Sequence, residues 1–447
     1  MIGARIGQTA PRGGLLGLLP DLEHDALGLL TAVARDYGDL VHMRLGLTQT
    51  VLVSHPHLVE EMLVTRNADY RKNLGARRLG SLLGNGLLLS EGEFWLRQRR
   101  LMQPAFHRQR LAQMGQTMVS LAAGVLDGWR DGETREMQAE MTEITLRIAA
   151  QTLFGTDVAE DLARIRAASL TTTNHFRSRL FSLLILLPDG VPTAGNLRYK
   201  RAVRDLDALV YRMIGERRGT DADGHDLLGM LLAARDEDDR AMTDRQLRDE
   251  VMTLLLAGHD TTALALTWSL VLLAQHPDAA ARLRSEVDVI LGERRAAVED
   301  LPRMPYLESV FMETLRLYPT AWLIGREAVR DTRLGGERIP RGTTLLVSPW
   351  VLHRDPRFHE DPSAFRPERW SDGLASRLPR FAYVPFGGGQ RICIGSSFAQ
   401  MEAMLVLASI AQRFRWSLDP HVPSIEPLPV VTLRPRQLVP MRLSGRI

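Results

Sequence analysis

The sequence predicts a mainly α-helical fold with a small β-sheet subdomain. Helical periodicity recurs through most of residues 55–320, whereas strand-like alternation is confined to short pieces near the N-terminus and beyond residue 320. The chain has 447 residues, of which 45% are hydrophobic, so it can fill a large core. No repeat, heptad pattern or low-complexity linker divides it. We therefore expect a single domain over residues 1–447.

The predicted elements follow the spacing of apolar residues and the positions of turn residues. Helical spacing predicts helices at residues 22–37, 57–65, 92–101, 108–127, 136–154, 158–170, 197–217, 225–235, 244–275, 277–292, 304–317 and 394–414. Short alternating pieces predict strands at residues 39–46, 50–54, 324–329 and 344–348. The first helix ends at Gly38, since glycine favours helix C-termini, and the first two strands form a hairpin with Thr48 and Gln49 near its turn.

These elements divide the chain into four regions. The regions are a loose leader rich in Gly and Pro (1–20), a small sheet (38–54), a mainly helical part (55–320), and a last part with strands, a meander, a glycine-rich loop and the final helix (321–447). The apolar residues 251–275 could cross a bilayer, and only Asp260 among them is charged. Because charged residues crowd the preceding segment and no second span follows, we expect a buried helix and no integral membrane span.

The charge and the cysteine content exclude several classes of protein. The 56 basic residues are dispersed among 53 acidic ones, only Lys72 and Lys200 are lysines, and the formal net charge is +3, so nucleic acid is not the expected partner. A single cysteine cannot form an internal disulfide, and no N-terminal secretion signal is recognisable. We therefore expect a cytoplasmic protein.

The single cysteine lies in the loop "PFGGGQRICIG", residues 385–395. Gly387, Gly388 and Gly389 allow positive φ and a close approach to a flat ligand, and Cys393 stands just before a predicted helix. Backbone N–H groups, the helix N-terminus and Arg391 are expected to lower the pKa of the thiol and favour the thiolate. The alternative is a buried inert cysteine, but such a residue needs no glycine-rich loop.

The loop resembles a known cofactor-binding motif. Phe386, Gly389, Arg391, Cys393 and Gly395 fit the spacing F-x-x-G-x-R-x-C-x-G, which resembles the haem-binding loop of the cytochrome P450 family. The resemblance implies that Cys393 is the axial thiolate ligand of iron in haem b, that Phe386 packs beside the thiolate, and that Arg391 meets a haem propionate. Gly389 and Gly395 complete the expected cofactor-binding loop.

A second motif lies on the predicted helix before Pro319. In "ETLR", Glu313 and Arg316 are three residues apart and could form an ordinary surface ion pair. The segment "FRPERW" follows at residues 365–370, and the resemblance implies that its Arg369 joins the first two residues in a buried charge network. Buried ions must be paired, so we expect this network to tie the helix to the cysteine loop.

A third motif, "AGHDTT", lies in the middle of the long apolar helix. A threonine there could simply bond to its own helix, but a carboxylate in an apolar interior is costly without a partner. The pattern resembles the oxygen-activating segment of the same family. By that resemblance Gly258 leaves room for dioxygen beside a locally distorted helix, Thr261 hydrogen-bonds the activated oxygen, Asp260 brings in protons through water, and Ala257 lies beside the oxygen site.

Further basic and aromatic residues resemble propionate ligands. In "WLRQRR", Trp95 and Arg99 project from one helical face, and Arg326 stands where the family has another propionate partner. A solvated basic helix end is the alternative, and we assign Arg97 and Arg100 to it.

The resemblance covers nearly the whole chain and implies the triangular helical prism of the cytochrome P450 fold around haem. No flavin or ferredoxin domain fits in the length, so electrons must come from separate proteins, a ferredoxin or flavodoxin with its NAD(P)H-dependent reductase. Arginines that flank the thiolate loop in sequence are expected to dock this acidic partner: Arg97, Arg100, Arg108, Arg110, Arg377 and Arg380. We expect a monomer.

The expected activity is that of a haem-thiolate monooxygenase. It would insert one oxygen atom from dioxygen into an apolar substrate such as a fatty acid, terpenoid, steroid or macrolide, because the candidate pocket segments 73–89, 179–188 and 320–325 are largely aliphatic. Arg177 or Arg179 could pair with a fatty-acid carboxylate or could be solvated. A peroxide-driven peroxygenase and a non-catalytic haem sensor are the alternatives within the fold.

Other enzyme classes fit the sequence poorly. The residues around Ser397 nearly match a hydrolase nucleophile elbow, but a glycine-rich loop precedes them instead of a buried strand. Neither lysine follows a glycine, which excludes a G-K phosphate loop. A zinc site from His353, His359 and Glu360 is possible, but no metalloprotease motif accompanies these residues.

Overall fold

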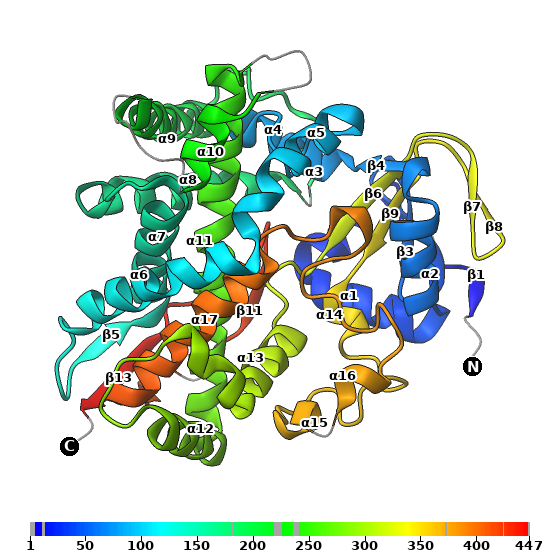
Figure 1. Ribbon diagram of the computed structural model, residues 1–447. Coiled ribbons are helices and arrows are strands. Elements are labelled where there is room, and N and C mark those ends of the chain that lie inside the picture. Colours follow the sequence, from blue (N-terminus) through cyan, green and yellow to red (C-terminus); the bar gives the residue numbers. More distant parts are fainter. Residues whose placement is uncertain are drawn as a thin grey trace.

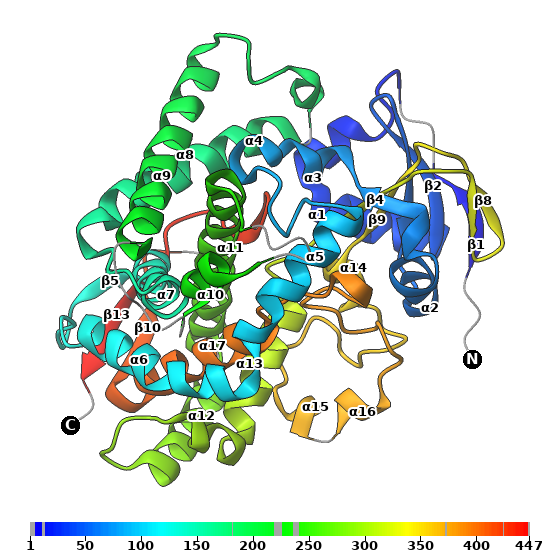
Figure 2. The ribbon, with the colours of Figure 1, turned by 45° about the horizontal axis from the view of Figure 1, so that its top comes forward.

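The computed structural model describes residues 5–10, 14–180, 182–218, 226–235, 241–371, 373–422 and 424–445. Residues 1–4 and 11–13 of the expected leader lie outside this set. The chain is mainly helical, as predicted, and Figure 1 shows the helices gathered on one side and the largest sheet, with the N-terminal elements, on the other. Figure 2 shows the same division from a second direction.

The helices account for most of the chain. They are α1 (Leu19–Tyr37), α2 (Pro56–Glu60), α3 (Leu74–Arg78), α4 (Gly80–Leu83), α5 (Gly92–Met102), α6 (Arg108–Leu126), α7 (Met137–Phe154), α8 (Leu162–Leu180), α9 (Ala194–Arg218), α10 (Leu227–Ala233), α11 (Asp244–Gln275), α12 (Pro277–Leu291), α13 (Pro305–Leu317), α14 (Pro349–Leu352), α15 (Glu368–Ser371), α16 (Leu374–Arg377) and α17 (Ser396–Arg413). A π-helical turn, Glu61–Thr65, continues α2. Most predicted helices are confirmed within a few residues. Helix α8 is longer, since it extends from the predicted end at residue 170 to Leu180.

The strands form one large sheet and three small ones. They are β1 (Ile6–Thr9), β2 (Leu40–Leu45), β3 (Thr48–Val53), β4 (Tyr70–Lys72), β5 (Thr134–Glu136), β6 (Ile324–Ala328), β7 (Thr332–Leu334), β8 (Glu337–Ile339), β9 (Thr344–Val347), β10 (Phe414–Leu418), β11 (Pro427–Pro429), β12 (Leu433–Pro435) and β13 (Pro440–Gly445). The large sheet has the order β1-β2-β3-β9-β6-β4. The small sheets are β10-β13-β5, β11-β12 and β7-β8.

The sheet differs from the sequence prediction in two places. Strand β1 lies inside the expected leader and pairs in parallel with β2, so this part of the leader is not loose. The β2–β3 turn is made by Gly46, whose φ is 60°, and Leu47, whereas Thr48 and Gln49 already belong to β3. The reason is backbone geometry, since glycine accepts positive φ without strain and threonine does not.

Helix α11 runs through the helical part of the chain, as expected for a buried helix. It begins with a capping box, in which Thr243 and Gln246 satisfy each other's backbone N–H groups. From Leu247 onward most of its side chains are buried. Across the described residues, no helix combines the length and the apolar character needed to cross a membrane.

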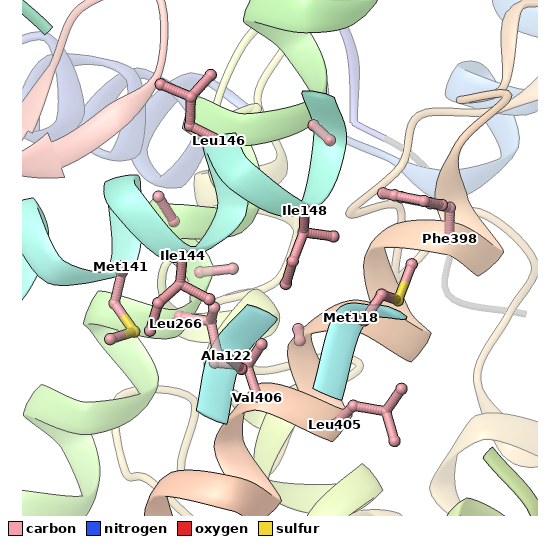
Figure 3. Close-up of a cluster of buried hydrophobic side chains, with 14 of the residues drawn as sticks. Met118, Ala122, Met141, Ile144, Leu146, Ile148, Leu266, Phe398, Leu405 and Val406 are labelled. Atoms are coloured by element: carbon pink, nitrogen blue, oxygen red, sulfur yellow. The ribbon is translucent and has the colours of Figure 1, made fainter. Parts of the chain in front are cut away.

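The core lies where α6, α7, α11 and α17 meet. Figure 3 shows buried side chains that these four helices contribute to the core: Met118, Ala122, Met141, Ile144, Leu146, Ile148, Leu266, Phe398, Leu405 and Val406. Helix α17 directly follows the cysteine loop and α11 carries the "AGHDTT" motif, so this packing fixes the two motifs relative to each other.

Candidate functional site

The cysteine loop is a tight turn that ends just before α17. The backbone N–H of Cys393 donates to the carbonyl oxygen of Phe386 at 3.0 Å, which closes the loop. Gly387 and Gly389 have φ values of 72° and 68°, as predicted, whereas Gly388 has an extended φ of −166°. The prediction of positive φ is therefore wrong for Gly388.

Contacts with protein, in addition to any ligand, explain two of these glycines. A Cβ at Gly389 would lie 2.0 Å from the carbonyl oxygen of Leu63 in the Glu61–Thr65 turn. A Cβ at Gly388 would lie 2.2 Å from the ring of Phe381. Only glycine allows this approach, so the loop is fixed from the outside by the chain itself. At Gly395 a Cβ would meet only the Phe106 ring, at 3.7 Å.

The electrostatics of the thiol differ from the prediction. Cys393 is accessible, yet burial among protein atoms raises the pKa of its thiol, against the opposing effects of the Gly395 N–H and Arg99. The expectation of a lowered pKa is therefore wrong, because desolvation outweighs the favourable neighbours. Coordination to a metal would itself remove the proton.

The cations near the loop have specific partners. Arg391 donates to the Ser90 carbonyl at 2.6 Å, forms an ion pair with Glu91, and stacks its guanidinium 4.1 Å from the Trp95 ring centroid. Arg391 is therefore not the cation that acts on the thiol. Arg99 takes that place, and it also donates to the Ile392 carbonyl at 2.8 Å. The sequence prediction named Arg391 as the cation that acts on the thiol and assigned Arg99 to a propionate only.

Two further cations lie beside Arg391. Strands β4 and β6 pair Lys72 with Arg326, and both respond to the charge of Arg391. Burial lowers the pKa of Lys72 well below its ordinary value and lowers the pKa of Arg326 to about 10, with Arg391 adding to both shifts. Sequence reasoning missed Lys72, although it is one of only two lysines and precedes the glycine-rich stretch of residues 75–92.

These residues fit the haem that the loop motif implies. Lys72, Arg99, Arg326 and Arg391 are four basic side chains, and Glu91 is the only carboxylate among the described residues that counteracts the pKa shifts of the Lys72, Arg326 and Arg391 side chains. Buried like charges are costly without anions. Two propionates would supply two negative charges, and the thiol of Cys393 would supply the iron ligand.

Helix α11 presents a different geometry from the one expected. Its residues stay α-helical through the motif, so the expected local distortion is not present. The Thr261 hydroxyl donates to the Ala257 carbonyl at 2.7 Å, as the alternative interpretation of the motif states, while Ala257 itself is exposed. A Cβ at Gly258 would meet the Ala149 side chain on α7 at 4.0 Å. Thr261 and Ala257 are four residues apart and therefore share one helix face.

Asp260 is partnered, as the cost of burying a carboxylate demands. Thr432 donates to its Oδ2 at 3.0 Å, and the Arg434 guanidinium approaches both carboxylate oxygens at 3.1 and 3.2 Å. The sequence signalled the need for a partner but not its identity, because Arg434 is 174 residues further along the chain.

The structure brings together the predicted charge network. Arg316 donates to both Glu313 oxygens at 2.8 and 2.9 Å, and Arg369 donates to the same carboxylate at 3.0 Å. Trp370 adds an indole N–H bond at 2.9 Å, which the sequence did not predict. Glu313 and Arg316 are fully buried.

Histidines connect this network to the cysteine loop. Arg316 donates to the His353 carbonyl at 2.9 Å, and the His353 ring accepts from the Val384 N–H at 2.8 Å, two residues before Phe386. Burial lowers the pKa of His353 well below its ordinary value and that of His359 to about 4. Within the described ranges, no cluster of three or more His, Cys, Asp or Glu residues is arranged to hold a metal ion.

A buried acid in α17 also escaped the sequence prediction. Glu402 is fully buried, and burial raises its pKa well above the ordinary value, against the opposing effect of the Thr262 hydroxyl. A lone acid inside the apolar run "MEAMLVLASI" was the available signal.

The candidate substrate segment 179–188 differs from the prediction. Arg179 is buried and donates to Asp189 at 3.0 Å and to Asn196 at 2.6 Å, so it is neither solvated nor open to a fatty-acid carboxylate. These bonds tie the end of α8 to the start of α9. Leu183 and Leu184 are 44% and 51% exposed, so they do not belong to a buried pocket wall.

Comparisons with known proteins agree with this geometry. The profile of the family Cytochrome P450 matches residues 8–440. Cyclooctatin synthase of Streptomyces melanosporofaciens is 39% identical over 404 residues, which cover 90% of this chain and 86% of the relative. Pentalenene oxygenase of Streptomyces avermitilis is 35% identical over 414 residues, with coverages of 92% and 91%. The solved structure "Retinoic acid bound cyanobacterial CYP120A1" superposes with a TM-score of 0.87 at 28% identity, covering 99% of this chain and 100% of that one.

Proposed function

Because this chain belongs to the cytochrome P450 family and is a monooxygenase, we propose that it oxidises an apolar terpenoid. The observation that carries the proposal is the similarity, over about nine tenths of the chain, to the relatives named Cyclooctatin synthase and Pentalenene oxygenase. The site is compatible with it, since the side chain next to Thr261 on the same face of α11 is the methyl group of Ala257. An apolar ligand gains by burial against such a surface.

Each residue of the site has a separate proposed role. Haem supplies the activation of dioxygen once it is bound. Cys393 would hold the iron, and Lys72, Arg326 and Arg391 would neutralise the propionates. Trp95 would keep the Arg391 guanidinium in place through its ring. Thr261 would accept and pass a proton at its Oγ1, and the Asp260 carboxylate would exchange protons with water.

Binding spectra test the proposed substrate class. We expect terpene hydrocarbons to displace water from iron in the haem-loaded protein and to produce a high-spin shift in haem absorbance, whereas straight-chain fatty acids produce little change. Ala257→Phe should remove the terpene shift by filling the space beside Thr261, while the spectrum of the reduced carbon monoxide complex is kept. A shift with fatty acids and none with terpenes would contradict the proposal.

Replacement of Thr261 separates a dioxygen-activating enzyme from the two alternatives, a peroxygenase and a haem sensor. We expect Thr261→Ala to lower the fraction of NAD(P)H electrons recovered in product by about tenfold or more, with peroxide as the by-product, because a positioned proton donor contributes about 10²–10⁴-fold. Thr267→Val is the matched control, since Thr267 makes the same bond to the carbonyl four residues earlier, at 2.7 Å, but is buried in the core. Unchanged recovery in Thr261→Ala would refute the proton role.

Electrons are proposed to arrive from a separate ferredoxin or flavodoxin at the outer side of the cysteine loop. Arg100 and Arg108 are exposed, and the turn between them contacts the loop through Phe106 and Gly395. Complementary charge speeds such encounters by about 10-fold or more at low salt. Reversal of both arginines to glutamate should slow reduction by an acidic partner by about that factor. Arg245→Glu, at the start of α11, is the control, and a rate independent of both salt and reversal would argue against this face.

A further inference from the structure

The C-terminal hairpin β11–β12 lies against α11 at the level of Asp260 (Figure 1). Its two strands pair Leu428 with Arg434 and Pro429 with Leu433. Nothing in the sequence motifs points to this hairpin as part of the site. Two of its side chains nevertheless contact the one carboxylate that the proposed function uses for proton exchange.

The hairpin occupies both oxygens of the Asp260 carboxylate. Thr432 Oγ1 donates to Oδ2 at 3.0 Å, and Arg434 Nη2 lies 3.2 Å from Oδ1 and 3.1 Å from Oδ2. The same Nη2 also donates to Thr432 Oγ1 at 3.1 Å, so the three side chains form a closed triangle. The side chain of Arg434 is only 14% exposed. Charge-assisted hydrogen bonds of this kind orient a carboxylate strongly.

Leu433 lies between Thr432 and Arg434 in the sequence, and both of its backbone polar groups are hydrogen-bonded to other segments. The Leu433 N–H donates to the Thr320 carbonyl at 3.0 Å, and the Leu433 carbonyl accepts from the Trp268 indole at 3.1 Å. Trp268 lies on α11, eight residues after Asp260. Its hydrogen bond therefore holds the hairpin against the same helix that carries Asp260. A second indole, that of Trp322, donates to the Val430 carbonyl at 3.0 Å.

The contact between Arg434 and Asp260 uses one nitrogen of the guanidinium. The Nε of Arg434 is buried and has no hydrogen-bond partner among the described residues, and only one guanidinium nitrogen reaches the carboxylate. This contact differs from the two-pronged pair of Arg316 with Glu313, in which two nitrogens each reach one carboxylate oxygen. The geometry of Arg434 is suited to holding the carboxylate in one direction.

We propose that Arg434, together with Thr432, is a positioning residue for the monooxygenase reaction: it fixes the direction of the Asp260 carboxylate and thereby the path by which protons reach the face of Thr261. This inference rests on the proposed function, in which Asp260 exchanges protons with water. The effect of Arg434 is exerted through Asp260 alone.

Four variants of the haem-loaded, full-length protein test the proposal. We expect Arg434→Gln and Thr432→Val to lower the fraction of NAD(P)H electrons recovered in product by about threefold or more, with KM unchanged, and Arg434→Lys to recover part of it. Arg436→Gln is the matched control, because Arg436 lies on the same hairpin and pairs with Glu426 at 3.3 Å near the surface. Arg436→Gln should behave as the wild type.

A double-mutant cycle with Asp260→Asn shows whether Arg434 acts through Asp260. We expect Arg434→Gln to add nothing to the loss already caused by Asp260→Asn. The urea concentration at the midpoint of unfolding is a readout that does not depend on turnover. Asp260→Asn should shift this midpoint by the same amount in the wild type and in the Arg436→Gln variant. In the Arg434→Gln variant the shift should be smaller. Equal recovery of electrons in Arg434→Gln and Arg436→Gln, or a full additional loss in the Asp260→Asn background, would overturn the proposal.

A different measurement, the binding spectrum of the wild type, would show that the proposed substrate class is wrong. The spectrum would then lack a terpene-induced absorbance shift. The variants would then be compared with whichever apolar compound produces that shift, so the role of Arg434 is still decided.

Discussion

Replacement of Cys393 with alanine is expected to abolish both the red-shifted Soret band of the reduced carbon monoxide complex and the monooxygenase activity. The loss of activity should exceed about 100-fold, since even residues that only orient a metal ligand commonly cost 10–100-fold. The physical reason is that the four cations of the site can retain haem through its propionates but cannot donate electron density to its iron.

Absorbance spectroscopy of the reconstituted protein measures this outcome directly. Ser397→Ala is the control, because Ser397 is exposed at the start of α17, four residues from the thiol, and should leave the band unchanged. A red-shifted band that persists in Cys393→Ala would show that another group holds the iron. We expect the Cys393→Ala protein to retain haem but to lack the red-shifted band. This result would show that iron ligation and propionate binding depend on different residues.

Removal of Arg316 is expected to destabilise the fold by about 3–5 kcal/mol, the usual cost of leaving a buried charge without its partner. Arg316 has no exposed surface, and it holds Glu313 and three carbonyl groups of the segment before the cysteine loop, those of His353, Pro362 and Ala364. Arg316→Ala should therefore lower the free energy of unfolding and loosen the loop as well, so that haem is lost at a lower urea concentration than in the wild type.

The matched control is an ion pair on the surface. Arg282 pairs with Glu368 at 3.1 Å, with the side chains 56% and 47% exposed, and such pairs contribute about 0–1 kcal/mol. Arg282→Ala should therefore leave the unfolding curve nearly unchanged. Equal effects of Arg282→Ala and Arg316→Ala would contradict the structural role of the buried network.

The parts of the site that could be predicted are those in which local sequence carries the chemistry. A lone cysteine among glycines indicated a ligand loop, and in the structure the Cys393 N–H closes this loop onto the Phe386 carbonyl. Glu313 and Arg316 stand three apart on one helix, so their pairing needed no distant information. The roles of these residues in catalysis and haem binding remain proposals that the experiments above address.

The wrong predictions have two causes. Some depend on how desolvation compares with the effect of neighbouring charges, and others depend on contacts between segments far apart in the sequence. The pKa of Cys393 is raised because desolvation, which depends on everything packed around the sulfur, outweighs Arg99 and the Gly395 N–H. Lys72 lies beside Arg326 only because β4 pairs with β6, and Arg179 is hydrogen-bonded to Asp189. Strand β1 was missed because a four-residue strand carries almost no periodic signal.

The sequence by itself determined the helical class, the cysteine loop and the positions of the acid and the alcohol in α11, since periodicity and short motifs are local properties of the chain. Only the tertiary structure decided which cations gather beside Glu91, how the thiol is desolvated, and that a hairpin near the C-terminus holds Asp260. Those features depend on groups far apart in sequence, and their energies come from burial and from pairing across space, which no local pattern records.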